Sequence, residues 1–162
     1  MALNLDNLTF IIVTFKSGHV IHECINSLPD NSKIIVIENS LDKKFKKELE
    51  EKYPSIKIII QENIGMGAAN NKGIKICETD YAFVINPDIK FEKDTIDKII
   101  DFSIIENDYA ILAPMSDDDN HPNYNIKNKK LINHELKYLN VDSVDGFAML
   151  INKKKFKDDY YF

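Results

Sequence analysis

The sequence predicts an α/β domain in which a mainly parallel sheet carries helices on both faces. Two observations support this prediction. Short runs of β-branched and aromatic residues, such as residues 8–14 and 33–38, are typical of strands that are buried on both faces. The stretches between these runs place apolar residues at helical spacing. Strands that alternate with helices in this way form parallel sheets through right-handed crossovers.

The expected elements can be placed along the chain from composition and periodicity. Apolar runs predict strands at residues 8–14, 33–38, 56–60, 81–86 and 109–113. Helical spacing predicts helices over residues 20–28, around Phe45 and Leu49, from the turn at 63–67 to Cys77, and across residues 96–104. After a polar stretch at 115–130, further strands are expected at 139–144 and 146–151, and another element begins at Lys153.

Length and composition place the chain among globular proteins. Its 162 residues suit a single domain, taken here as residues 1–162, and a hydrophobic fraction of 44% can supply a core. The formal net charge of −5 argues against a general nucleic-acid partner, which needs a basic face. All 21 basic residues are Lys, so no guanidinium can clamp a phosphate. Any bound anion must be held by Lys, by backbone N–H groups or by a metal.

Several features favour a cytoplasmic location. No apolar run approaches the ~18 residues that a membrane span needs, and the first residues lack the pattern of a secretory signal. Cys24 and Cys77 each lie among apolar residues, as buried thiols do in a reducing compartment. The run Lys153-Lys154-Lys155 could contact an acidic membrane surface, although three lysines at the start of a helix are more often a solvated face.

Polar and aromatic residues follow the predicted strands where ligands usually bind, beyond the carboxyl ends of a parallel sheet. Thr14 and Phe15 close the first strand, Glu38-Asn39-Ser40 closes the second, residues 63–67 follow the third, and Asn86-Pro87-Asp88 closes the fourth. The ring can stack on a base, the first carboxylate can accept base or ribose hydrogen bonds, and the second can hold a metal against phosphates. This convergence suggests a nucleotide-type ligand. Taken singly, Thr14 could merely end a strand and Glu38 could cap the following loop.

The residues at these strand ends also carry a resemblance to a known family, through the segments 12–15, 37–40, 63–74 and 81–88. In this order they are similar to the nucleotide-sugar half of a family-2 glycosyltransferase, and closest to its rhamnosyltransferase-like branch. The similarity covers residues 8 to 156. It implies a Rossmann-like sheet of the GT-A type, a UDP- or dTDP-sugar donor, a glycan or lipid-linked acceptor and a divalent cation, Mg²⁺ or Mn²⁺.

On the base side, the resemblance implies roles for residues of three segments. Thr14 and Phe15 would line the base pocket, and Glu38 would stand where the family has an aspartate that reads the base. Asn71 would help to form the donor pocket. Lys16 stands where the family commonly has an asparagine, so the contacts of that position are not carried over.

On the phosphate and sugar side, the resemblance implies that Asp88 is the metal ligand and that Asn86 lies near the ribose or diphosphate. Asn63 and Gly65 would belong to the turn of the donor pocket, and Gly146 would leave room beside the sugar. Because Asn86 replaces an acid, we expect weak metal binding in the absence of the nucleotide.

The general base is not among these residues. In the family it is an acid that follows the strand with the small residue, so we expect it beyond Phe162, together with the acceptor-binding part. Asp158 and Asp159 are the late acids of this chain, and they precede that position. We therefore expect a chain that is truncated at its C-terminus, binds the donor, and transfers sugar slowly or not at all.

Two other functions stay open on the sequence alone. A nucleotidyltransferase also uses such a sheet and a metal-bound diphosphate, but it needs a glycine-rich, basic loop where residues 15–18 supply one Lys and one Gly. A non-catalytic donor-binding or interaction module is the other. The acidic cluster at 117–119 with His121 does not match a calcium-binding loop, and we expect a solvated surface loop there.

Overall fold

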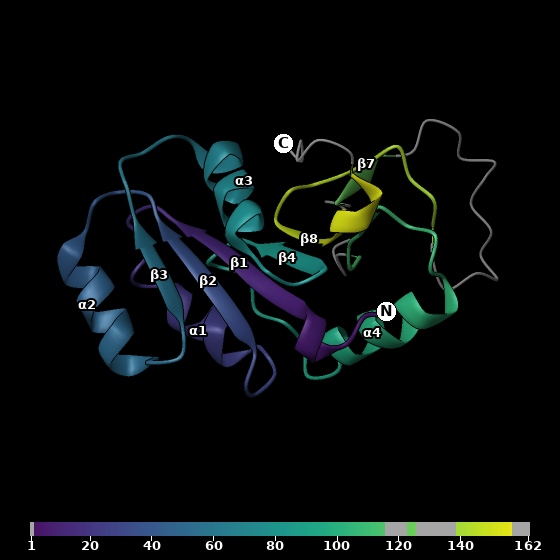
Figure 1. The fold of residues 1–162 in the computed structure, drawn as a ribbon, viewed down its shortest axis with the longest axis horizontal. Helices are drawn as coiled ribbons and strands as arrows, with labels where there is room; N and C mark the ends of the chain where they lie inside the picture. Colours follow the sequence, from purple (N-terminus) through teal and green to yellow (C-terminus); the bar gives the residue numbers. More distant parts are fainter. Residues whose placement is uncertain (1, 116–122, 126–138, 157–162) are drawn as a thin grey trace.

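The structure is a computed structural model that describes residues 2–115, 123–125 and 139–156. Its main sheet has six strands in the order β3-β2-β1-β4-β8-β5 (Figure 1). The strands are β1 Leu8–Thr14, β2 Lys33–Glu38, β3 Lys57–Ile60, β4 Tyr81–Ile85, β5 Ile111–Leu112 and β8 Ala148–Asn152. Strands β1, β2, β3 and β4 run parallel to one another, whereas β8 runs antiparallel to both β4 and β5. This confirms the α/β fold with a mainly parallel sheet.

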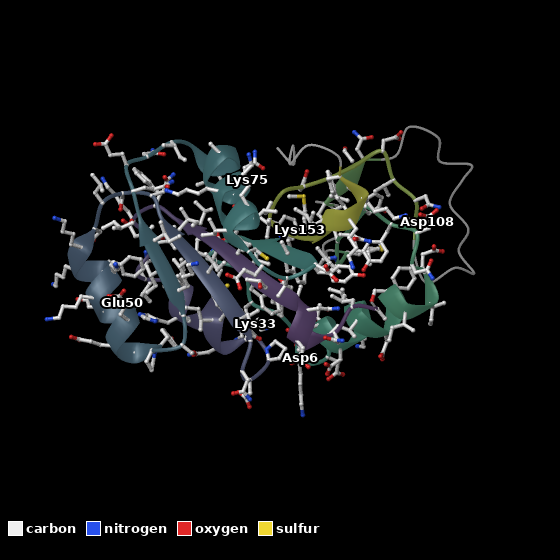
Figure 2. All side chains as sticks on the ribbon, in the orientation of Figure 1. Asp6, Lys33, Glu50, Lys75, Asp108 and Lys153 are labelled. Carbon is white, nitrogen blue, oxygen red and sulfur yellow. The ribbon has the colours of Figure 1, made fainter. Side chains whose placement is uncertain are left out.

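The helices cover both faces of this sheet. They are α1 Ile21–Asn26, α2 Lys43–Lys52, α3 Met66–Ile76 and α4 Thr95–Ile105, with short 3-10 turns η1 Leu5–Asn7 and η3 Lys153–Lys155. Alternate residues of β1 separate the two faces: Phe10 and Ile12 pack in the cluster that contains α1, α2 and α4, and Ile11 packs in the cluster that contains α3. Charged side chains such as Glu50 on α2 and Lys75 on α3 point away from these clusters (Figure 2).

Helix α3 lies unusually close to the sheet because Gly73 faces it. A Cβ atom at Gly73 would come within 2.3 Å of the Ile11 Cγ2 atom, a separation that real side chains do not tolerate. The missing side chain therefore allows α3 to pack directly on β1 and β2. This packing fixes the position of the first turn of α3 beside the ends of those strands.

The second half of the chain departs from the sequence-based expectations. The strand expected at 109–113 is only Ile111–Leu112, and it does not neighbour β4 because β8 lies between them. The strand expected at 139–144 is only β7 Ser143–Val144, which pairs with β6 Tyr124–Asn125 outside the main sheet. Periodicity reports how buried a segment is, but strand order is set by contacts between segments far apart in the chain.

Candidate functional site

The carboxyl ends of β1, β2 and β3 are joined by main-chain hydrogen bonds into one edge. The Asn39 N–H donates to the Thr14 carbonyl at 2.8 Å, and the Gln61 N–H donates to the Glu38 carbonyl at 2.9 Å. Leu41 then donates its N–H to the Gln61 carbonyl at 3.2 Å. The three loops that follow these strands therefore lie side by side, as the sequence predicts.

Glu38 is fully buried at this edge, and the loop that follows it donates hydrogen bonds to its carboxylate. One oxygen, Oε1, accepts from the Ser40 N–H at 3.0 Å and from the Ser40 hydroxyl, and the other, Oε2, accepts from the Asp42 N–H at 2.8 Å. A buried carboxylate needs such donors to replace water. The structure thus places Glu38 at the predicted edge and shows that it holds the 39–42 loop.

Asn39 is a second buried polar residue of the edge, and the sequence did not single it out as functional. Its amide nitrogen donates to Asn63 Oδ1 at 3.0 Å, and its Oδ1 accepts from the Gln61 side chain at 2.9 Å and from the Ile64 N–H at 3.2 Å. Gln61 in turn accepts from the Lys72 ammonium at 2.5 Å. The sequence does carry a signal that could identify Asn39, namely an amide side chain directly after a buried strand. Such an amide can donate to and accept from a neighbouring turn at the same time.

Thr14 and Phe15 differ sharply in exposure although they are adjacent. Thr14 is fully buried, and within the described residues its hydroxyl has no hydrogen-bond partner. Phe15 is 49% exposed, and the Lys16 ammonium lies 5.5 Å from the centre of its ring. Lys16 has a φ of 56°, a left-handed conformation that directs the chain away from β1. An exposed ring at a strand end is available to stack on a planar ligand.

The turn that leads into α3 is shaped by its own side chains. Asn63 Oδ1 accepts from the Gly65 N–H at 2.9 Å, and Gly65 has a φ of 84° that favours glycine. Helix α3 begins directly after it, so its first N–H groups face the same edge as Phe15 and Glu38. Asn71 is half-buried further along the helix.

The end of β4 presents an exposed carboxylate. Asp88 is exposed and Asn86 is half-buried, and the Asn86 N–H donates to the Phe147 carbonyl at 2.8 Å. That bond brings the turn with Gly146 beside the end of β4, although the two are far apart in the sequence. A Cβ atom at Gly146 would make only ordinary contact, 3.7 Å, with the Met149 Cε atom.

A divalent cation fits this edge only in company with another ligand. Among the described residues no three His, Cys, Asp or Glu side chains gather as a metal site. Asp88 offers one hard oxygen donor of the type that Mg²⁺ and Mn²⁺ prefer, and such ions are commonly held by one or two carboxylates plus substrate phosphates. The residues present therefore fit a metal that binds together with a diphosphate.

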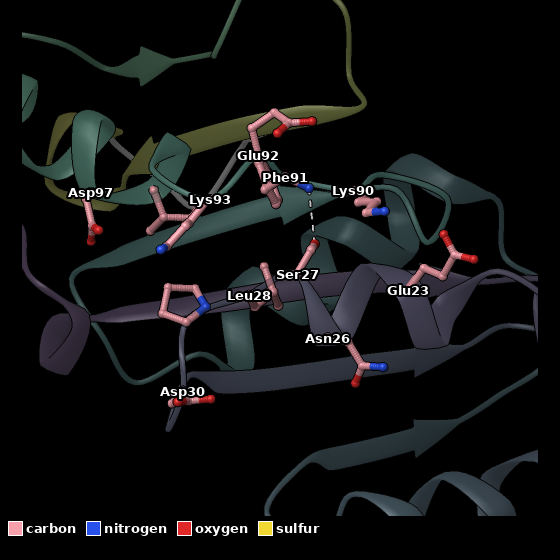
Figure 3. Close-up of a pocket in the computed structure, with 12 residues that line it drawn as sticks. Glu23, Asn26, Ser27, Leu28, Asp30, Lys90, Phe91, Glu92, Lys93 and Asp97 are labelled. Atoms are coloured by element: carbon pink, nitrogen blue, oxygen red, sulfur yellow. Dashed lines mark hydrogen bonds between the residues drawn. The ribbon is translucent and has the colours of Figure 1, made fainter.

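A hollow of about 820 Å³ lies between residues 23–30 and residues 90–97 (Figure 3). None of the residues predicted to bind the donor lines it. The residues predicted to bind the donor therefore lie outside this hollow, at the open edge of the sheet.

The remaining candidates lie elsewhere. Lys153 donates to the Cys77 carbonyl at 2.5 Å, Lys154 pairs with Asp80 at 2.6 Å, and Lys155 pairs with Asp108 at 2.5 Å. Each of the three lysines thus has a partner within the chain, and their contact with a membrane stays a prediction. None of the helices that the structure describes is long and apolar enough to cross a membrane.

Three of the predicted features fall outside the described residues. They are the acidic cluster at 117–119 with His121, the late acids Asp158 and Asp159, and the chain end at Phe162. The general base accordingly stays a prediction.

Solved structures with the same fold include TarS and a mannosyltransferase. TarS of S. aureus matches with a TM-score of 0.64 and 18% identity, over 91% of this chain and 47% of that chain. A TarS structure in complex with UDP-GlcNAc matches with a TM-score of 0.55 and 22% identity, over 66% of this chain and 33% of that one. The mannosyltransferase PcManGT from Pyrobaculum calidifontis, in complex with GDP-Man and Mn²⁺, matches with a TM-score of 0.62 and 11% identity, over 91% and 45%.

At these identities the likenesses show the fold, and this chain spans about half the length of the proteins it matches or less. No curated protein sequence matches the chain. A family model described as glycosyl transferase family 2 matches residues 9–158, nearly the whole chain and the whole of the edge built by β1, β2, β3 and β4. The chain belongs to glycosyl transferase family 2.

Proposed function

We propose that this chain binds a UDP- or dTDP-sugar at the carboxyl ends of β1, β2 and β4, for transfer of the sugar to a glycan or lipid-linked acceptor. One observation carries the proposal. β1 and β4 are neighbours whose register ends at the pair Ile12 and Ile85, so the exposed Phe15 ring and the exposed Asp88 carboxylate follow adjacent strand ends. An aromatic face for a base beside a carboxylate for a metal suits a nucleoside diphosphate.

The reaction in this proposal is a direct displacement. The acceptor oxygen forms a bond to the anomeric carbon while the bond from that carbon to the diphosphate oxygen breaks. A divalent cation at Asp88 would neutralise the charge that the diphosphate gains as it leaves. Phe15 would orient the base, the turn at Asn63 and Gly65 with Asn71 would enclose the donor, and Gly146 would leave space beside the sugar. The general base for the acceptor hydroxyl would lie outside the described residues.

The solved structures support the class of donor. TarS is recorded with UDP-GlcNAc and with UDP, and PcManGT with GDP-Man and Mn²⁺. Rhamnose as the transferred sugar rests on the sequence resemblance alone. Two free, buried thiols, Cys24 and Cys77, are in keeping with a cytoplasmic location.

Calorimetry of UDP and dTDP binding tests the proposal. We expect binding at least about tenfold tighter with Mn²⁺ than with EDTA, or 1.4 kcal/mol. Asp88→Ala should remove most of this gain, whereas Asp101→Ala, which removes an exposed carboxylate from α4, should keep it. Equal affinity in Mn²⁺ and EDTA would contradict the metal-assisted site.

Turnover separates an enzyme from a donor-binding module. If the full-length gene product binds the donor but neither hydrolyses it nor transfers its sugar to any glycan or lipid-linked acceptor, the edge is a binding module. Cleavage of the donor that depends on both Mn²⁺ and Asp88 supports the transferase.

A further inference from the structure

The turn that carries Asp88 is held by two side chains, Cys24 of helix α1 and Ser27 directly after that helix. Helix α1 packs on the face of the sheet opposite to α3. Residues 86–91 leave β4 and cross α1 before α4 begins. Asp88 lies in the middle of this segment and is exposed. Its position is therefore set by whatever fixes the two ends of the segment.

The first anchor is the peptide group of Asn86. Its N–H donates to the Phe147 carbonyl at 2.8 Å, which ties it to the turn before β8. Its carbonyl accepts from the Cys24 Sγ atom at 3.5 Å and from the Ile89 N–H at 3.3 Å. Cys24 thus binds the residue two positions before Asp88 from the helix side.

The second anchor is the N–H of Phe91, which donates to the Ser27 hydroxyl at 3.1 Å (Figure 3). Ser27 donates its own proton to the Cys24 carbonyl at 2.8 Å, so the hydroxyl is fixed in orientation. The Phe91 ring is buried against Phe83, with ring centres 5.5 Å apart. The far end of the segment is therefore held by packing and by the side chain of Ser27, the residue that ends helix α1.

The chemistry of Cys24 suits a permanent donor. Burial, with a further contribution from the charge of Asp88, raises the pKa of the Cys24 thiol to about 12. The thiol keeps its proton at neutral pH and can donate it to the Asn86 carbonyl.

A metal site with a single protein carboxylate depends on how well that carboxylate is held. Groups that orient a ligand without touching the metal commonly contribute 10–100-fold to metal affinity. Cys24 is fully buried, and both Cys24 and Ser27 contact the main chain of the turn rather than the Asp88 carboxylate.

We propose that Cys24 and Ser27 are positioning residues for Asp88, and that helix α1 thereby sets the affinity of the nucleotide-bound site for its divalent cation. This inference rests on the proposed function. It assigns a role to Cys24, which the sequence marks only as a buried thiol, and to Ser27, which the sequence places only in a predicted helix.

The test measures the metal gain, defined as the ratio of the UDP dissociation constants in EDTA and in Mn²⁺. We expect Ser27→Ala to lower the metal gain by about tenfold and Cys24→Ala by about threefold, because a thiol is the weaker donor. The UDP affinity in EDTA should stay within about twofold of wild type, whereas a merely destabilised fold would weaken binding in both buffers. Ser27→Thr and Cys24→Ser keep the hydrogen bonds to the Phe91 N–H and to the Asn86 carbonyl. These two variants should therefore retain most of the metal gain.

Cys77→Ala is the matched control, since it removes a buried thiol that contacts Thr79 and Tyr81 rather than the turn. If Ser27→Ala does not fold, Ser27→Cys keeps the size, weakens the hydrogen bond and should lower the gain in the same direction.

The outcomes separate this inference from the proposed function. If Asp88→Ala removes the metal gain while Ser27→Ala and Cys24→Ala retain it, the positioning role is wrong and the metal site stands. If the wild-type protein shows no metal gain, or Asp88→Ala retains it, the proposed metal site fails first. A loss of gain in Cys77→Ala equal to that in Cys24→Ala would also overturn the inference.

Discussion

Two strands of the same sheet end in a carboxylate, and the two carboxylates have opposite surroundings. Glu38 at the end of β2 is fully buried, and three donors of the next loop occupy its oxygens. Asp88, just after β4, is exposed on a turn whose main chain, rather than its carboxylate, is tied to the rest of the protein. One acid is engaged in holding structure, and the other is free to meet a ligand.

The position of a residue in a motif therefore does not by itself determine its role. The sequence left two roles open for Glu38, reading a base and capping a loop, and the contacts in the structure are those of the loop cap. Contact between Glu38 and a base stays a prediction. The comparison yields different expectations for the two acids, because substitution of Glu38 should act on stability and substitution of Asp88 on ligand binding.

The largest expected effect is that of Glu38→Ala on stability. The substitution leaves the Ser40 and Asp42 N–H groups without their acceptor, and an unsatisfied donor costs about 1–3 kcal/mol. We expect the free energy of unfolding to fall by about 2–4 kcal/mol, measured by urea denaturation. Glu51→Ala on the exposed face of α2 is the control and should change it by less than about 0.5 kcal/mol. A Glu38→Ala protein as stable as the control would contradict the structural role.

Asp88→Ala should show the reverse pattern. Because the carboxylate is exposed, we expect the free energy of unfolding to stay within about 0.5 kcal/mol of wild type. Nucleotide affinity in Mn²⁺ should fall by about 10–100-fold, or 1.4–2.8 kcal/mol, with little change in EDTA. Parallel calorimetry in both buffers provides the measurement. If Asp88→Ala instead destabilises the fold as much as Glu38→Ala does, the two strand ends are not distinct.

The sequence predicted the first half of the fold well for a physical reason. Each strand from β1 to β4 is a short apolar run, buried along most of β1, β2 and β4 and partly buried in β3. Each is linked to the next by a segment with its own apolar stripe. These signals are local, so they can be read without knowing what a segment contacts. The four strand ends of the candidate site follow directly from them.

The sequence could not predict which distant residues contact the segment that follows β4. The Phe147 carbonyl reaches Asn86 only because β8 enters the sheet antiparallel beside β4, a pairing between distant segments that no local pattern reports. The sequence marks Cys24 only as a buried thiol and places Ser27 only in a predicted helix. Their contacts with the 86–91 segment arise from how α1 packs under β4, which periodicity does not describe.

Phe15→Ala should have a smaller effect than either acid. The ring is exposed and contributes little to the core, so we expect a minor loss of stability. Stacking of an aromatic ring on a base is worth about 0.5–1.5 kcal/mol beyond area burial, so UDP affinity should fall by about 2–12-fold. Phe15→Tyr keeps the face and should bind normally. Inorganic diphosphate, which has no base, should bind equally to all three proteins, and a loss of diphosphate affinity in Phe15→Ala would contradict a base-stacking role.

The smallest expected effect is a gain in affinity on Lys16→Asn. The Lys16 ammonium lies 5.5 Å from the centre of the Phe15 ring, on a face where a base could stack. An exposed cation–π contact is worth about 0.5–1 kcal/mol, and a base that takes its place must displace it. Asn removes the cation and tolerates the φ of 56° at this position, so the turn itself should be preserved. We therefore expect UDP to bind about 2–5-fold more tightly, measured by calorimetry in EDTA to isolate the base from the metal. Weaker binding would show instead that Lys16 contacts the diphosphate, and it would place the phosphates rather than the base at the end of β1.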